Sequence, residues 1–175
     1  MPLEQLWATW RSNYVRGIDD SRTEVPTGEP ADGRSLFERI LQSGEPDSAT
    51  LIVYRGETCF VLMNRFPYTS GHLMVLPNRA AADLEELTPD EQHELWSLVR
   101  DGVAAVKAAL ACHGVNVGLN LGAVAGGSQS DHLHVHVVPR WQGDANFMSV
   151  AGETRVLPVG LEEAWESIRT AWPDS

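Results

Sequence analysis

The sequence is poor in positive charge. It has 13 lysine and arginine residues against 24 aspartate and glutamate residues, a formal net charge of −11, and Lys107 is its single lysine. This balance excludes a broad basic surface of the kind that binds nucleic acid or anionic membranes. It leaves room for a small anionic ligand that is held by a few aimed groups.

Long apolar runs and cysteines are also scarce. No apolar run approaches the roughly 18 residues that a membrane span needs, and residues 1–5 lack the basic and apolar stretches that begin a secretory signal. Two cysteines, Cys59 and Cys112, are too few for a disulfide scaffold. We therefore expect a cytoplasmic protein with reduced thiols and with no membrane or nucleic-acid partner.

What is present suits one globular domain with terminal additions. The 175 residues are 43% hydrophobic and 21% charged. We expect an N-terminal arm and linker over residues 1–34, a main domain over 35–147, and a C-terminal extension with a helix over 148–175. Apolar residues at helical spacing predict an amphipathic helix within the first 20 residues.

Capping signals and apolar patterns predict the elements of the main domain. Capping boxes at residues 35–38 and 88–91 predict helices over about 36–43 and 89–112, the second ended by Gly114. Short β-branched and aromatic runs predict strands over residues 51–54, 59–63, 72–77, 115–120 and 132–138. This order predicts an α+β fold with an antiparallel, five-stranded, meander-type sheet and the long helix packed on it.

Three of the six histidines, His132, His134 and His136, occupy alternate positions of the last predicted strand. Alternate residues share one face of a strand. The three imidazoles should therefore line one face while Leu133 and Val135 point to the core. A purely structural reason for three histidines on such a face is poor, so we expect chemistry there.

Two functions compete for this histidine cluster. A His-x-His pair on a strand can bind zinc with further ligands from elsewhere, although three imidazoles in a row are too linear to hold one tetrahedral ion together. Alternatively, the central histidine is a nucleophile that attacks phosphorus, flanked by two supporting histidines. The glycine-rich loop over residues 122–130 favours the nucleophile, because its backbone N–H groups and hydroxyls can close around phosphate oxygens.

The segment from His132 to Val138 matches the motif of the histidine triad (HIT) family, His-φ-His-φ-His-φ-φ with φ apolar, at every position. The resemblance covers about residues 35–141 and implies a HIT-like fold. Asn64, the segment 71–77 and the loop segment 126–128 also resemble segments of that family.

Flanking residues resemble one branch of the family more closely. The stretches around residues 6–14, 116–122 and 138–147 are similar to bacterial diadenosine tetraphosphate phosphorylases of the actinobacterial type. The resemblance implies cleavage of diadenosine tetraphosphate by inorganic phosphate to ADP and ATP, through a covalent AMP-histidine intermediate. It also implies a homodimer or a higher homo-oligomer.

The same resemblance implies a role for each site residue. His134 is the nucleophile, His136 hydrogen-bonds phosphate or the leaving oxygen, and His132 holds the tautomer of His134. The resemblance further implies binding of nucleotide or phosphate by Asn64 (ribose), Asn120, Gly127, Ser128, Gln129 and Trp141 (acceptor side), and a supporting position for His72.

Departures from the family pattern leave alternatives open. Ser128 stands where many members have glutamine, which modestly favours phosphorolysis over a hydrolase or nucleoside phosphoramidase that uses water. Zinc-bearing relatives carry Cys-x-x-Cys where Ser35 and Glu38 stand, so a structural zinc is not expected here. A noncatalytic zinc-binding protein remains a further alternative. We expect no tightly bound cofactor; magnesium is the ion that would travel with the substrate.

Overall fold

The protein is described by a computed structural model, which covers residues 33–126, 129–145 and 157–173. The expected N-terminal helix lies outside these residues. In chain order the main elements are α2 (Leu36–Leu41), α3 (Asp47–Thr50), β1 (Ile52–Arg55), β2 (Cys59–Met63), β3 (Leu73–Pro77), α4 (Pro89–Leu110), β4 (Gly114–Leu119), β5 (Val135–Arg140) and α6 (Leu161–Thr170). Two short 3-10 turns, Leu84–Glu86 and Ala123–Ala125, complete the set.

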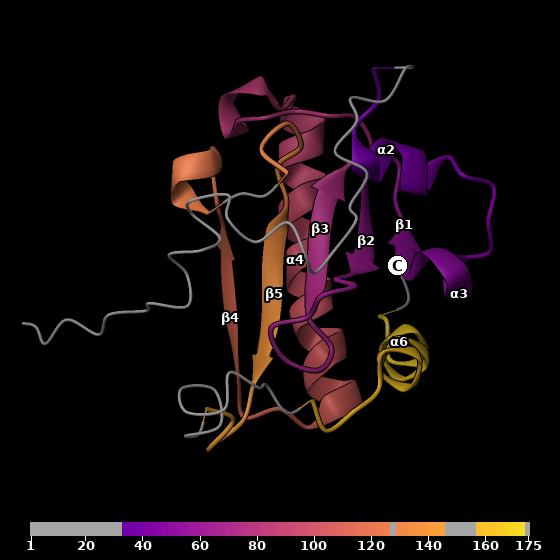
Figure 1. The fold of residues 1–175 in the computed structure, drawn as a ribbon, viewed down its shortest axis with the longest axis vertical. Coiled ribbons are helices and arrows are strands. Elements are labelled where there is room, and N and C mark those ends of the chain that lie inside the picture. The colour runs from indigo at the N-terminus through magenta and orange to yellow at the C-terminus, as the bar shows by residue number, and fades with distance from the viewer. Residues whose placement is uncertain (1–32, 127–128, 146–156, 174–175) are drawn as a thin grey trace, which may run out of the picture. The chain divides into compact units, whose positions relative to one another are not determined.

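The five strands form one antiparallel sheet in the order β1-β2-β3-β5-β4 (Figure 1). The expected α+β class and five-stranded sheet are confirmed. The last strand in sequence, β5, lies between β3 and β4, so His136 is paired with Met74 on one side and Gly118 on the other. The strand that carries His136 is therefore interior, and β4 is an edge among the described residues. The predicted strand over 132–138 begins later, at Val135, so His132 and His134 lie in the segment that leads into it.

The long helix α4 begins as predicted and ends earlier than predicted. Thr88 and Glu91 form the reciprocal capping box, with a proline in the first turn. The helix stops at Leu110 because Ala111 adopts a left-handed conformation with φ of 47°. The prediction that Gly114 ends the helix is wrong, since Gly114 is already the first residue of β4. Tertiary pairing of β4 thus outweighs the modest strain of a left-handed alanine.

Each face of the sheet carries its own apolar cluster. The face toward α4 holds the larger one, which includes Val61, Val75, Val135 and Val137 together with Leu95 of the helix. The opposite face holds a smaller cluster beneath α2, composed of Phe37, Ile52, Phe60, Leu62, Met74 and Leu76. Because side chains alternate along β5, burying its valines against α4 turns His134 and His136 to the α2 face.

Helix α6, which the sequence predicted near the C-terminus, packs on α4 and β1 (Figure 1). Ala164 and Ile168 are its buried residues, and the indole N–H of Trp165 donates to the carbonyl of Ile52 at 3.0 Å. No helix within the described residues is both long and apolar enough to cross a bilayer.

Candidate active site

The central histidine of the triad has one ring nitrogen in a hydrogen bond to the backbone. His134 lies just before β5, and its Nδ1 is 3.0 Å from the backbone carbonyl of His132. A carbonyl only accepts, so Nδ1 of His134 carries the proton and donates it. In the neutral ring the lone pair is therefore on Nε2, which is the form a nucleophile needs.

The first histidine is held at both ring nitrogens. His132 is fully buried, with its Nε2 2.9 Å from the carbonyl of Pro77 and its Nδ1 2.7 Å from the hydroxyl of Ser35. The Pro77 carbonyl accepts, which places the proton of His132 on Nε2 and makes Ser35 the donor to Nδ1. The ring position of His132 is thereby set by two other elements of the fold.

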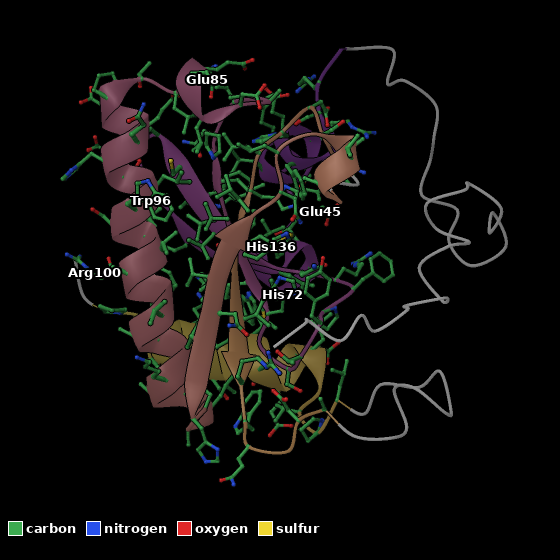
Figure 2. All side chains as sticks on the ribbon, turned by 90° about the vertical axis from the view of Figure 1, so that its left-hand side faces the viewer. Glu45, His72, Glu85, Trp96, Arg100 and His136 are labelled. Atoms are coloured by element: carbon green, nitrogen blue, oxygen red, sulfur yellow. The ribbon has the colours of Figure 1, made fainter. Side chains whose placement is uncertain are left out.

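The third histidine receives its tautomer from His72. The backbone N–H of Tyr68 donates to Nδ1 of His72 at 3.1 Å, so His72 carries its proton on Nε2. That Nε2–H donates to Nδ1 of His136 at 2.9 Å, which leaves the proton of neutral His136 on Nε2. Figure 2 shows His72 and His136 close together on the side of the sheet away from α4. A single backbone amide thus turns an N–H of His136 toward the site.

Gly71 sets the place of His72 at the start of β3. Its φ is +75°, in the left-handed region that favours glycine, and an added Cβ would lie 2.2 Å from Cδ1 of Leu110. The chain turns sharply there against the end of α4 and delivers His72 onto the sheet.

Burial keeps the triad uncharged at neutral pH. Loss of solvation lowers the pKa of His132, His134 and His136 below the ordinary value of 6.5. For His136 the pKa falls to about 4, with repulsion from a charged His134 as the second cause. The site therefore offers imidazole lone pairs and neutral N–H groups rather than imidazolium charge.

Two asparagines named from the sequence lie beside these rings. The side-chain nitrogen of Asn120 is 3.5 Å from Nε2 of His136. Asn64 accepts the backbone N–H of Phe66 at 2.9 Å, and its amide nitrogen is 3.4 Å from Nδ1 of His72. Asn64 therefore lies behind the triad, at the root of the loop between β2 and β3.

The remaining predicted site residues are spread along the chain. Gln129 uses its backbone carbonyl to accept the N–H of His132 at 3.5 Å. Gly127 and Ser128 lie outside the described residues. Trp141 is five residues beyond His136, roughly 16 Å along an extended strand, and its indole N–H donates to the carbonyl of Leu110 at 3.4 Å. Within one chain, Trp141 is thus not brought to the histidine rings.

The cation next to the motif is already paired. Arg140 donates to both carboxylate oxygens of Asp144, at 2.6 and 2.9 Å, and to Oδ1 of Asn116 at 2.8 Å. The hydrogen bonds from Arg140 lower the pKa of Asp144 to about 2. Across the described part of the chain, no group of three or more His, Cys, Asp or Glu residues is arranged to hold a metal ion.

Sequence reasoning missed two contributors to the site. Ser35 was identified only as a helix cap, and nothing in its spacing signals a partner 97 residues away. Tyr68, in the loop between β2 and β3, has its ring 4.5 Å from that of His72 and 5.6 Å from that of His136. The one local signal for Tyr68 in the sequence is its position four residues before a histidine.

A family model matches the part of the chain that carries this site. The model of the HIT domain matches residues 45–143, which include the whole triad and His72. The chain belongs to the HIT family. The matched range contains His132, His134, His136 and the interior strand β5.

Two relatives show which members of the HIT family this chain resembles. The chain is 40% identical over 170 residues to a Mycobacterium tuberculosis protein named AP-4-A phosphorylase, which covers 97% of this chain and 85% of that one. It is 32% identical over 93 residues to the Schizosaccharomyces pombe bis(5'-nucleosyl)-tetraphosphatase (asymmetrical), covering 53% of this chain and 50% of that one.

Among solved structures, a zinc-bound histidine triad family protein from Mycobacterium smegmatis is similar, with a TM-score of 0.64 and 27% identity. The match covers 78% of this chain and 91% of that one. At the positions where zinc-bearing relatives are expected to have cysteines, this HIT protein has Ser35 and Glu38, which form the capping box of α2.

Proposed function

We propose that this HIT protein is a diadenosine tetraphosphate phosphorylase that carries AMP on His134. The observation that supports nucleotidyl transfer is the tautomer of His134: its Nδ1–H is held by the carbonyl of His132 at 3.0 Å, and its buried, neutral Nε2 has the lone pair. The relation to the M. tuberculosis phosphorylase over 97% of the chain supports the choice of substrate and acceptor.

In the first step Nε2 of His134 attacks an α-phosphorus of diadenosine tetraphosphate. An N–P bond forms, the P–O bond to the remaining three phosphates breaks, and ATP leaves with the bonding electrons. We expect the Nε2–H of His136 and the neighbouring amide N–H of Asn120 to donate to oxygens that gain charge in this step. Magnesium bound to the substrate would carry part of that charge.

In the second step inorganic phosphate attacks the phosphorus of the AMP-histidine intermediate. A P–O bond forms, the N–P bond breaks, and ADP leaves while Nε2 of His134 recovers its lone pair. Splitting one displacement into two is the advantage of a covalent nucleophile. Contacts from Gly127, Ser128, Gln129 and Trp141 to phosphates, and from Asn64 to the ribose, remain predictions of this proposal.

The second candidate is a hydrolase of the same fold, in which water replaces phosphate in the second step. The similarity to the S. pombe tetraphosphatase favours this candidate over activities unrelated to dinucleotides. The first step is common to both, so the triad does not separate them.

Product analysis separates the two candidates. The purified protein is incubated with diadenosine tetraphosphate with and without inorganic phosphate, and nucleotides are separated by chromatography. The proposal expects ADP and ATP in equal amounts, with turnover that depends on phosphate. AMP and ATP at the same rate without phosphate would assign the hydrolase instead, and no cleavage in either buffer would refute both.

We also propose that the protein forms a homodimer through β4 and α4. Strand β4 is an edge of the sheet among the described residues, and its Val117 is 44% exposed, while Trp96 on α4 is 47% exposed. Figure 2 looks onto β4 with α4 and Trp96 beside it. Sedimentation of the wild type at the dimer mass, and of Trp96→Glu/Val117→Lys at the monomer mass, is expected; a monomeric wild type would contradict this.

A reducing, cytoplasmic setting is proposed from the cysteines. Cys59 and Cys112 are both free thiols, and burial raises the pKa of the Cys59 thiol to about 11. A thiol so rarely ionised is a packing group rather than a reactive one. Localisation of a tagged protein by cell fractionation tests the setting.

A further inference from the structure

One buried hydroxyl connects the start of helix α2 with the triad. The Oγ of Ser35 accepts the backbone N–H of Glu38 at 3.1 Å, which is the ordinary cap of α2. The same oxygen lies 2.7 Å from Nδ1 of His132, and Ser35 is 5% exposed. No other use of the α2 cap was apparent from the sequence.

The direction of the second hydrogen bond is determined by its surroundings. Nε2 of His132 must donate to the Pro77 carbonyl, so Nδ1 is an acceptor and the proton between Ser35 and His132 belongs to Ser35. The hydroxyl therefore donates its one proton to His132 and uses a lone pair for the helix cap.

Glu38 connects the backbone at Ser35 with the backbone near Pro77. Its carboxylate accepts the backbone N–H of Ser35 at 2.8 Å and that of Ala80 at 3.1 Å. Ala80 follows Pro77 by three residues, so the groups that hold the two nitrogens of His132 are tied to each other. The pKa of Glu38 is lowered although burial opposes this, because these backbone donors and Ser35 favour the carboxylate.

We propose that Ser35 is a positioning residue of the triad: by donating to Nδ1 of His132 it holds that ring neutral and fixed, and so aligns the His132 carbonyl that selects the reactive tautomer of His134. The role rests on the proposed nucleotidyl transfer. Ser35 touches neither the substrate nor the reacting atoms. It acts on His134 through one side chain and one backbone carbonyl.

The hydrogen bond between Ser35 and His132 has a second consequence, because Ser35 begins the helix that carries Phe37. Phe37, two residues after Ser35, places its ring 5.5 Å from the rings of both His132 and His134. The hydroxyl thus fixes the apolar wall beside the nucleophile and the histidine behind it to one another.

The charge state of His132 depends on the groups that surround its ring. The titratable groups around His132 are Glu38 from α2, Asp131 before it and His134 after it. Two of these are carboxylates that favour an imidazolium. A hydroxyl donor at Nδ1 opposes them, because it stabilises the ring only when that nitrogen has its lone pair.

Three substitutions at Ser35 separate its role as the cap of α2 from its hydrogen bond to His132. Ser35→Asp keeps a good helix cap but offers an acceptor to Nδ1, which should protonate His132 on both nitrogens. Ser35→Ala removes the cap and the link. Ser35→Thr keeps both. Thr88→Ala is the matched control, because Thr88 forms the same capping box on α4 and its hydroxyl accepts from Glu91 of that helix.

The first readout is the ¹⁵N NMR spectrum of the His132 ring, which does not depend on any activity. We expect one protonated and one unprotonated nitrogen at pH 7 in the wild type and in Ser35→Thr, and two protonated nitrogens in Ser35→Asp. Wild-type signals in Ser35→Asp would overturn the proposal, whether or not the protein proves to be a phosphorylase.

The second readout is kinetic. Ser35→Asp should bind AMP within about threefold of the wild type in calorimetry, since α2 stays capped, while kcat falls by about thirtyfold or more. Ser35→Ala should lose about tenfold in kcat, and Ser35→Thr should restore activity. Equal kcat values for Ser35→Asp and the wild type, or a loss in Ser35→Ala no larger than in Thr88→Ala, would overturn the positioning role. A wild type without cleavage activity would instead refute the proposed function.

Discussion

Replacing His72 by leucine tests how the site fixes the tautomer of His136. His72 is fully buried and links the backbone N–H of Tyr68 to Nδ1 of His136, at 3.1 and 2.9 Å. Leucine occupies a comparable volume but cannot donate. The buried Nδ1 of His136 then has no partner at that position.

The magnitude follows from the groups left unpaired. A buried acceptor without a partner costs about 1–3 kcal/mol, and the half-exposed loop around Tyr68 lets water reach its N–H. We expect a loss of about 2 kcal/mol in the free energy of unfolding, which lowers Tm by roughly 4–8 °C in a chain of this size.

The catalytic effect should be separate from the loss of stability. Without the donor from His72, neutral His136 no longer has its proton fixed on Nε2. Losing a hydrogen bond to a charged phosphate oxygen costs about 1.5–3 kcal/mol, which corresponds to a reduction of kcat by about ten- to hundredfold.

The assay compares phosphorolysis rates and thermal melting for three variants. His72→Leu should lose rate and stability. His72→Gln, whose amide can place an N–H near the lost Nε2, should recover part of both. His93→Leu, on the exposed surface of α4, should resemble the wild type. A wild-type kcat in a folded, destabilised His72→Leu would refute the reasoning about the tautomer.

Two further outcomes follow from the described contacts. The pKa of His136 is lowered from 6.5 to about 4, so the unfolded chain binds a proton that the folded chain refuses between these values. The contribution of His136 to the free energy of unfolding should be fully present above pH 6.5 and should decrease by about 3 kcal/mol toward pH 4. Urea unfolding of the wild type and of His136→Gln at several pH values measures this difference. The same pH dependence of unfolding in both proteins would contradict it. The carboxylate of Glu94 accepts the backbone N–H groups of Glu57, Thr58 and Cys59 at 2.9, 2.6 and 2.9 Å. Glu94→Ala should cost about 2–3 kcal/mol in urea unfolding with unchanged kcat, and a cost below about 0.5 kcal/mol would show that the turn holds without it.

Much of the fold was predictable because its signals are local. The capping boxes at Ser35 and Thr88 mark helix starts with side chains that bond within four residues, and side-chain alternation separates His134 and His136 from Val135 and Val137. The short helix α3 was not predicted. Leu51, which was expected to begin a strand, instead ends α3 in a left-handed conformation with φ of 62°. A leucine in a run of β-formers predicts a strand, and only the packed chain overrides that preference.

The identity of the triad was predictable, and its protonation pattern was not. The alternating histidines of residues 132–136 carry the chemistry in their spacing. Which nitrogen of each ring has the proton depends on the carbonyl of Pro77, the N–H of Tyr68 and the hydroxyl of Ser35. These partners come from distant segments, so their positions follow from the pairing of the strands and the docking of α2.

The central claim is that His134 receives AMP, and trapping the intermediate tests it most directly. The protein is mixed with diadenosine tetraphosphate in the absence of phosphate, quenched under conditions that preserve an N–P bond, and examined by intact-mass and peptide mass spectrometry. The account predicts one AMP on the wild type, located on His134, removed on addition of phosphate with formation of ADP, and absent from His134→Ala. An adduct on another residue, or full phosphorolysis by His134→Ala, would contradict it.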